Sequence, residues 1–212
     1  MKLYVVRHGE TDWNKNKRLQ GQVDIPLNQL GRTLARKTAK ALADIPFEIC
    51  YTSPLGRAQE TARLILEGRE VPILDDARLM EISFGDYEGK CFSKNGWNLP
   101  QEFHCFFDEP ENYKAASRGE DFAQVRERMG AFLRDICAKP QYRDCNILVT
   151  THGAAMSGMM NYIKGEPISR FWGEGVHKNC AVTELQVTED GIVKIIAENV
   201  VYYDDVVEPW EA

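Results

Sequence analysis

The sequence lacks the patterns of a disulfide-rich, zinc-binding or membrane-spanning protein. Its six cysteines are irregularly spaced, with no Cys-x-x-Cys pair: Cys50, Cys91, Cys105, Cys137, Cys145 and Cys180. This spacing is unlike that of a disulfide framework or a zinc ribbon. No apolar run approaches the roughly 18 residues that a membrane span needs, and the first residues show no apolar signal-peptide core. We therefore expect a cytoplasmic protein that is kept reduced and binds no membrane.

An excess of basic residues is also missing. The formal net charge of the 212 residues is -6, whereas a surface that tracks nucleic-acid phosphates normally needs excess Lys and Arg. We therefore expect no nucleic-acid partner, although a small basic pocket for an anionic metabolite remains compatible with this charge. The length is sufficient to bury a core. With no internal repeat or low-complexity linker, the sequence predicts a single domain over residues 1–212.

Two short apolar runs each end in a His-Gly pair. Residues 2–6 read as a buried strand that stops at Arg7-His8-Gly9, and residues 146–151 read as a second strand followed by His152-Gly153. In open α/β sheets, ligands bind at the carboxyl ends of the strands. If the two strands are neighbours, His8 and His152 lie side by side at that edge.

Strand and helix patterns alternate along the rest of the chain. Further strands are predicted at about 47–52, 71–74, 182–187 and 193–201, and helices at about 28–42, 53–66, 122–138 and 153–164. An Asp-Gly turn at 190–191 predicts a hairpin between the last two strands. The pattern indicates an α/β fold, a three-layer α/β/α sandwich whose mostly parallel sheet carries an antiparallel edge strand.

Three segments have no clear period. Residues 12–21 are the first and read as a polar loop. The helix predicted at 53–66, by contrast, has a clear start, because Ser53-Pro54 reads as its capped first turn, which carries Arg57. Residues 91–118 are dense in aromatics and predict a lid-like excursion with short helices, whose aromatic side chains pack against one another. The acidic tail, residues 204–212, is expected to be loose.

Five side chains form a set suited to phosphoryl transfer: Arg7, His8, Arg57, Glu81 and His152. Such chemistry needs cations around the phosphoryl oxygens, a nucleophile in line and a proton donor for the leaving oxygen. Arg7 and Arg57 can bind the oxygens, and Arg57 together with Gly153 falls at predicted helix N-termini that favour anions. His8 can attack phosphorus if its other ring N–H is held by an acceptor. Glu81 can donate the proton and later accept one from water.

Four motifs in order carry a resemblance to a known family. They are Arg7-His8-Gly9-Glu10-Thr11, the segment 53–62, Glu81 within the segment 81–89, and Thr151-His152-Gly153. Together they resemble the histidine phosphatase superfamily, also called phosphoglycerate-mutase-like, over about residues 1–200. The resemblance implies His8 as the residue that is phosphorylated, Glu81 as the proton donor, and Arg7, Arg57 and His152 as the phosphate pocket. It also implies that Asn14, Gln20, Gly21 and Gly153 line that pocket. Because Arg7 and Arg57 stand where a phosphatase can use metal cations, we expect catalysis without a metal or other cofactor.

Other readings of the same residues are weaker. Cys50 and Arg57 echo a Cys-x5-Arg phosphatase loop, but six residues intervene and would misplace the arginine. A metal site built from His8, His152 and Glu81 is conceivable, yet the nearby arginines would repel a cation. The remaining histidines, His104 and His177, are interpreted as structural.

Within the family, the choice lies between hydrolysis and mutase chemistry. The mutases resemble one another in a longer basic insertion with adjacent arginines after the catalytic glutamate. Residues 90–118 contain only scattered basic residues, with no arginine pair. We therefore expect a phosphatase that acts on a small phosphorylated metabolite, with a phosphoglycerate mutase and a noncatalytic phosphate-binding module as alternatives. The sequence does not identify the leaving group or the oligomeric state.

Overall fold

The computed structural model describes residues 1–205 and is centred on one six-stranded sheet with the order β3-β2-β4-β1-β5-β6. The strands are β1 (Lys2–Arg7), β2 (Phe47–Thr52), β3 (Ile73–Asp75), β4 (Asn146–Thr151), β5 (Val182–Val187) and β6 (Val193–Val200). The pairs β3–β2, β2–β4 and β4–β1 are parallel, and the β5–β6 hairpin adds the antiparallel pairs. The predicted mostly parallel sheet with an antiparallel edge is confirmed.

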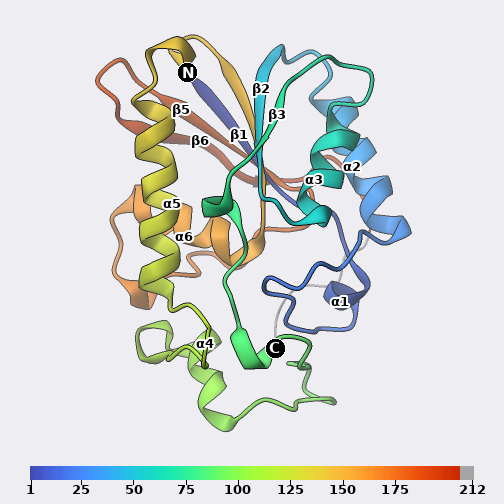
Figure 1. Cartoon of the computed structure of the whole chain (residues 1–212), viewed down its shortest axis with the longest axis vertical. Coiled ribbons are helices and arrows are strands. Elements are labelled where there is room, and N and C mark those ends of the chain that lie inside the picture. Colours follow the sequence, from blue (N-terminus) through green and yellow to red (C-terminus); the bar gives the residue numbers. More distant parts are fainter. Residues whose placement is uncertain (206–212) are drawn as a thin grey trace.

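Helices cover both faces of this sheet (Figure 1). The helices α2 (Gln29–Ala41) and α3 (Gly56–Ile65) lie on one side, and α5 (Phe122–Cys137) and α6 (Gly153–Lys164) lie on the other. The expected three-layer α/β/α arrangement is therefore present. Within the part of the chain that the structure describes, no helix has the length and apolar character that a membrane span requires.

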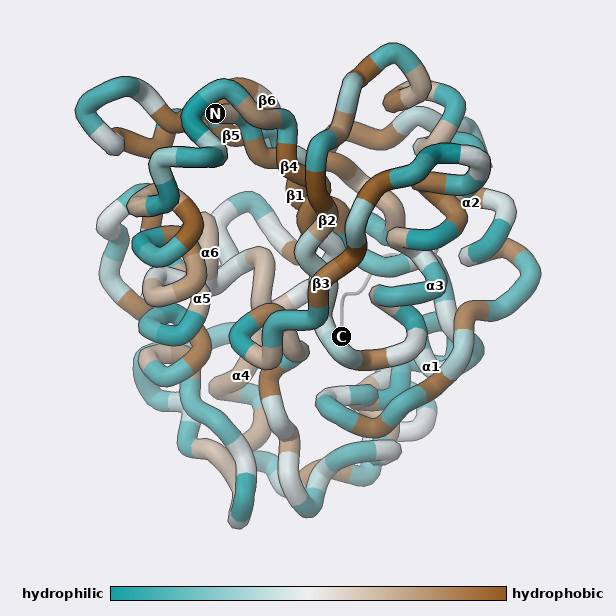
Figure 2. Tube along the Cα trace, turned by 45° about the horizontal axis from the view of Figure 1, so that its top comes forward, coloured by the Kyte–Doolittle hydropathy of each residue, from teal (hydrophilic) through white to brown (hydrophobic). Residues whose placement is uncertain are grey.

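The alternation of side chains along β1 explains why two layers of helices are needed. Leu3 and Val5 point into the large core shared with residues of α5 and α6, whereas Tyr4 and Val6 point into the core shared with Ile65 of α3. All four strand residues are almost fully buried. Figure 2 shows the central strands as hydrophobic segments between mixed helices. A strand that is apolar on both faces must be covered on both.

The structure corrects three local predictions. Residues 12–21 are not all loop, because Thr11 forms a capping box with Asn14 and opens the short helix α1 (Asp12–Lys15). The helix α3 begins at Gly56 instead of Pro54, with Leu55 at the N-cap and no side-chain cap. The Ser53 hydroxyl accepts from the Leu55 N–H at 3.3 Å and lies 2.8 Å from a ring nitrogen of His152. The third strand covers 73–75, two residues later than its predicted start.

The excursion at 91–118 is built from short helices, as expected. They are α4 (Cys105–Asp108) and the 3-10 helices η3 (Gln101–His104) and η4 (Pro110–Asn112). Phe103 and Phe106 are buried, and their rings stack with centroids 5.0 Å apart. The ring centroid of Phe122 of α5 lies 5.0 Å from that of Phe106. The prediction that these aromatics pack against one another is confirmed.

Further 3-10 turns lie between the main elements. They are η1 (Ala77–Leu79), η2 (Gly85–Tyr87), η5 (Pro140–Tyr142) and η6 (Ile168–Arg170). The first two flank the segment that carries Glu81. Of the tail predicted to be loose, only residues 204 and 205 belong to the described part of the chain, so that prediction falls almost wholly outside it.

A close approach of two backbones fixes the first motif against α2. A Cβ atom on Gly31 would lie 2.2 Å from the Glu10 carbonyl oxygen, and one on Gly9 would lie 2.6 Å from the Gly31 carbonyl oxygen. Only glycine leaves room for this contact. The contact holds the segment after β1 at the carboxyl end of the sheet.

Candidate active site

A pocket with an empty volume of about 330 Å³ lies at the carboxyl ends of β1, β2 and β4. These strands are adjacent, and the last residue of β1, Arg7, pairs with Thr151 of β4. The lining residues come from segments far apart in the sequence: Arg7, His8, Asn14, Arg18, Gln20, Gly21, Arg57, Glu81, Phe84, Gly153, Ala154 and Val176. The structure thus brings together all the predicted site residues; His152 is not among the lining residues, but its ring lies 5.1 Å from that of His8.

His8 presents one uncommitted ring nitrogen to this pocket. Its Nδ1 lies 2.6 Å from the carbonyl oxygen of Gly9, which can only accept, so Nδ1 carries the proton. Burial, with the charges of Arg57 and Arg7, holds the pKa of His8 well below its ordinary value. The ring is therefore neutral at neutral pH, and Nε2 has the free electron pair of a nucleophile.

His152 lies beside His8, with the two ring centroids 5.1 Å apart. The adjacent strands predicted this proximity. His152 is fully buried, and its Nε2 contacts the hydroxyl of Ser53. Its Nδ1 is buried without a protein partner, and burial holds the pKa of the ring well below its ordinary value. His152 is therefore a neutral, fully buried ring packed beside His8.

Two buried arginines supply the positive charge of the pocket. Arg57 donates to the carbonyl oxygens of Gly21 and Val23, each at 2.7 Å. Arg7 donates to the carbonyl oxygen of His177 at 2.5 Å. The Nε atom of each arginine is buried and has no partner in the protein. Burial lowers the pKa of Arg57 to about 10, so its guanidinium keeps its charge at neutral pH.

The predicted polar lining comes from the segment after α1. The Gln20 side-chain oxygen accepts from the Thr11 hydroxyl at 2.9 Å, and the Asn14 side-chain oxygen accepts from the Thr11 backbone N–H at 3.1 Å. These contacts occupy the side-chain oxygens of Gln20 and Asn14 and leave their amide NH2 groups as the donors that remain for a ligand. Gly21 has a φ of 51° and packs against the Glu88 carboxylate, a position where a Cβ would collide with that group. The segment therefore offers N–H groups suited to an oxyanion.

The two predicted helix N-termini are occupied by carboxylates of the protein itself. The Gly56 N–H at the start of α3 donates to Asp24 at 2.9 Å. At the start of α6, the N–H groups of Ala154 and Ala155 donate to Glu81 at 3.2 and 2.9 Å. These contacts use the N–H groups of Gly56, Ala154 and Ala155, whereas Arg57 and Gly153 line the pocket, so anion binding at these termini stays a prediction for those two residues. The arginines remain the main anion-binding groups.

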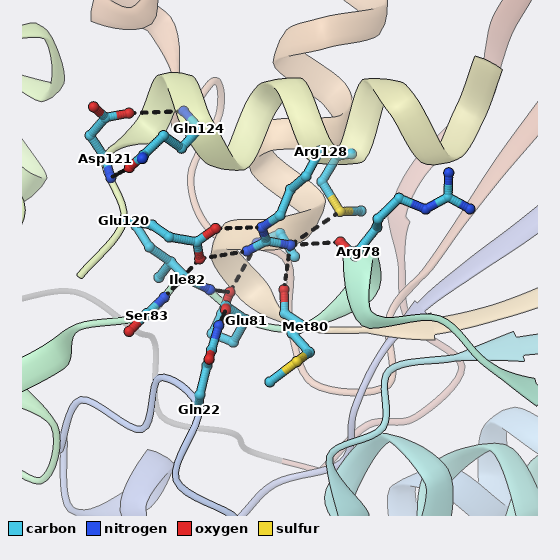
Figure 3. Close-up of polar contacts among 12 residues, drawn as sticks. Gln22, Arg78, Met80, Glu81, Ile82, Ser83, Glu120, Asp121, Gln124 and Arg128 are labelled. Atoms are coloured by element: carbon cyan, nitrogen blue, oxygen red, sulfur yellow. Dashed lines mark hydrogen bonds and ion pairs between the residues drawn. The ribbon is translucent and has the colours of Figure 1, made fainter. Parts of the chain in front are cut away.

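Glu81 also lines the pocket, and its carboxylate is held by three backbone N–H groups. Besides the two from α6, the Ile82 N–H donates to Glu81 Oε1 at 3.0 Å. The Glu81 carbonyl oxygen accepts from the Gln22 side chain at 3.1 Å, as Figure 3 shows. The carboxylate is therefore fixed in place beside the pocket.

Sequence reasoning missed four lining residues, Arg18, Phe84, Ala154 and Val176. Three of them lie within four residues of a predicted site residue, so the motifs could have indicated them. Val176 belongs to the loop between α6 and β5, which carries no sequence signal. Asn179 of the same loop donates to the His8 carbonyl oxygen at 2.9 Å. This loop thus braces the first motif, and its Cys180 carbonyl oxygen accepts from Thr38 of α2 at 3.0 Å.

Cysteine chemistry and a metal cluster find no support at this site. Cys50 is fully buried in the core, where burial raises the pKa of its thiol to about 12. Among residues 1–205, no group of three or more His, Cys, Asp or Glu side chains is arranged to hold a metal ion. The burial of Cys50 agrees with our rejection of a cysteine-based phosphatase loop built from Cys50 and Arg57.

His177 provides a test of how burial acts on a histidine near the site. Its ring is buried, and burial outweighs the Glu198 carboxylate 3.7 Å away, lowering the pKa of His177 to about 4. Between the ordinary histidine pKa and this value, only the unfolded chain is protonated, so stability falls as the pH falls from about 6 to about 5. We expect His177→Gln to reduce the slope of the free energy of unfolding against pH in this range by about 1.4 kcal/mol per pH unit.

Urea denaturation of both proteins at the two pH values measures the change. Equal slopes for the wild type and His177→Gln would mean that His177 is already protonated in the folded protein, which contradicts the effect of its burial.

Comparison with known proteins gives a consistent match over nearly the whole chain. Residues 3–199 match the sequence model of the histidine phosphatase superfamily (branch 1). Phosphoserine phosphatase 1 of Hydrogenobacter thermophilus is 28% identical over 196 residues, 92% of each chain. A probable phosphoglycerate mutase, GpmB, of Escherichia fergusonii is 30% identical over 194 residues, 89% of this chain and 86% of the relative.

A solved structure shows the same architecture. The YhfR protein of Bacillus stearothermophilus superimposes with a TM-score of 0.87 and is 35% identical, covering 95% of this chain and 98% of that one. Sequence and fold therefore match the same family from end to end.

Proposed function

Because the chain belongs to branch 1 of the histidine phosphatase superfamily and is a phosphatase, we propose that it hydrolyses small phosphomonoesters through a phosphohistidine on His8. The observation that carries this proposal is the state of His8. Its ring is neutral, its Nδ1 proton is held by the Gly9 carbonyl oxygen, and its Nε2 faces a pocket with two buried arginines. A neutral imidazole beside fixed cations is suited to attack on a phosphoryl group.

In the first step, Nε2 of His8 attacks phosphorus while the bond to the ester oxygen breaks. Arg7 and Arg57 stabilise the charge on the phosphoryl oxygens, and the unpartnered Nε atoms of both arginines are donors for it. Glu81 in its protonated form gives its proton to the leaving oxygen, so that the alcohol departs neutral. The products of this step are the alcohol, phosphohistidine and the Glu81 carboxylate.

In the second step, water replaces the alcohol. The Glu81 carboxylate takes a proton from the water as its oxygen attacks phosphorus, and the bond from phosphorus to Nε2 breaks. Inorganic phosphate leaves, His8 is again neutral, and Glu81 is again protonated. One carboxyl group can serve both steps because the leaving oxygen and the attacking oxygen occupy the same side of phosphorus in turn.

Hydrolysis is favoured over mutase chemistry by what lines the pocket. No residue of the excursion at 91–118 is among the lining residues, and Arg118 pairs with Asp86 at an exposed position. A mutase must hold its sugar acid between two phosphoryl transfers, which requires several cations around the pocket; among the described lining residues, Arg18 is the one cation besides Arg7 and Arg57, and it donates to the Gly89 carbonyl oxygen at 2.9 Å. The names of the relatives, phosphoserine phosphatase and probable phosphoglycerate mutase, support a small phosphorylated acid as substrate. We further propose that the enzyme acts in the cytoplasm.

A screen of phosphorylated metabolites, read out by release of inorganic phosphate, tests the function. We expect rapid release from at least one small phosphomonoester, with phosphoserine and phosphoglycerates as the first candidates. Transfer of phosphate between positions of a phosphoglycerate, without net release, would favour the mutase. Binding of phosphorylated compounds without either reaction would favour the noncatalytic module.

We expect this activity to be independent of metal ions. Arg7 and Arg57 occupy the place where a metal-dependent phosphatase holds its cations. Hydrolysis of an aryl phosphate should therefore continue at an unchanged rate after exhaustive treatment with EDTA, measured against an untreated sample. Loss of the activity on chelation, with recovery on adding one divalent metal, would contradict the proposal.

A further inference from the structure

The segment that carries Glu81 is held by an ion pair between Arg128 and Glu120 (Figure 3). Arg128 of α5 and Glu120, which directly precedes that helix's N-cap residue, form a bidentate pair, with Nε to Oε1 at 2.7 Å and Nη2 to Oε2 at 3.1 Å. Only 17% of the Arg128 side chain and 21% of the Glu120 side chain are exposed. The parallel geometry and low exposure make this a rigid contact.

Arg128 uses its remaining donor group on the backbone just before Glu81. Its Nη1 donates to the Arg78 carbonyl oxygen at 2.6 Å and to the Met80 carbonyl oxygen at 2.7 Å. The planar guanidinium can make these bonds and the Glu120 pair together because its donors point in fixed directions. The residue immediately before Glu81 is thereby fixed to α5.

Glu120 holds the backbone just after Glu81. Its Oε2 accepts from the Ser83 N–H at 3.0 Å, and its own N–H donates to the Ser83 carbonyl oxygen at 2.9 Å. The ion pair thus binds residue 80 through one partner and residue 83 through the other. Glu81 lies between these two attachments, with its carboxylate turned toward the pocket and the N-terminus of α6.

We propose that Arg128 and Glu120 are positioning residues that set the place of the Glu81 carboxyl group relative to the leaving oxygen. The inference rests on the proposed function of Glu81 as general acid. Neither residue lines the pocket, so neither touches the substrate. A general acid must lie within hydrogen-bond reach of the leaving oxygen, and a displacement of about 1 Å can lower a rate by about 10²-fold.

The same helix provides a matched control. Arg134 of α5 pairs with Glu127 at 2.6 Å, but their side chains are 52% and 68% exposed, and neither holds the Glu81 segment. Arg134→Lys and Glu127→Gln therefore change an arginine and a glutamate of one ion pair on α5 without altering the attachment of Glu81.

The test compares Arg128→Lys and Glu120→Gln with those two controls. A lysine has a single donor centre and cannot replace the fork that joins Glu120 to two carbonyl oxygens. The rate of phosphoryl transfer to the enzyme is measured in the burst phase, with an alkyl phosphate and with nitrophenyl phosphate. We expect both variants to lose about 10-fold to 10²-fold on the alkyl phosphate and much less on nitrophenyl phosphate, because a good leaving oxygen departs without its proton.

Glu81→Gln in the same experiment separates this inference from the function on which it rests. If Glu81→Gln itself shows no dependence on the leaving group, Glu81 is not the acid and the proposed function fails. If Glu81→Gln shows it but Arg128→Lys and Glu120→Gln lose equally on both substrates, or lose nothing, the positioning role is wrong. Should Arg128→Lys fail to fold, Glu120→Gln, which keeps an oxygen for Ser83, decides the matter.

A double variant provides the final check. When Glu81 is already glutamine, Arg128→Lys should cause no further loss specific to the alkyl phosphate. An additional loss of that kind in the double variant would mean that Arg128 acts by another route.

Discussion

Replacing His8 by alanine is expected to lower phosphatase turnover by about 10³-fold or more, in the range found when a covalent nucleophile is removed. The effect follows from the role proposed for the ring, which lines the pocket with Nε2 free of a protein partner and has fixed cations as neighbours. No other described residue offers an equivalent atom, because the ring of His152 is not among the lining residues and is engaged with Ser53.

Steady-state phosphate release with an aryl phosphate measures the loss. His104→Ala is a suitable control, since His104 stacks on Trp97 in the excursion at 91–118 and does not line the pocket. The control should keep the activity of the wild type. A near-normal rate for His8→Ala would contradict the proposed nucleophile.

Replacing Glu81 by glutamine is expected to slow hydrolysis of alkyl phosphates by about 10²-fold or more, within the usual range for general acid catalysis. Glutamine keeps the size of the side chain, and its carbonyl oxygen can still accept from the α6 backbone, but it cannot give a proton at neutral pH. The loss should depend on the leaving group, because only a poor leaving oxygen needs the proton.

Burst kinetics are required to see this dependence. Glu81 is also expected to activate the water that releases phosphate from His8, so steady-state rates can fall for every substrate. The burst reports the transfer step alone, and there nitrophenyl phosphate should lose much less than an alkyl phosphate. An equal loss for both in the burst would show that Glu81 only positions the substrate.

Local patterns predicted most of the fold because each main element carries its own signal. Asn28 and Asp121 cap their helices as expected, and the Asp-Gly turn joins the last two strands. The two strands that end in His-Gly are indeed neighbours, which brings His8 within 5.1 Å of His152. Periodicity and capping are short-range properties, so they can be read from a sequence without its partners.

What the sequence could not show depends on long-range pairing. Nothing near Arg128 indicates that its guanidinium meets Glu120 and the backbone of residues 78 and 80. The capture of the α6 N-terminus by Glu81, a residue 73 positions away from Ala154, is equally invisible in local patterns. The sequence places the start of α3 at Ser53-Pro54, and it likewise does not show that Ser53, after β2, contacts His152, after the neighbouring β4. Such contacts appear only when the strands have assembled.

The most direct test of the account is to trap and locate the phosphoryl group during turnover. Enzyme mixed with a fast substrate and quenched in alkaline denaturant should contain a phosphorylated residue that is stable to base and labile to acid, as a phosphohistidine is. Peptide mapping should place it on His8, and it should be absent from His8→Ala. A phosphoryl group on His152, or on a residue that is not a histidine, would contradict the central claim.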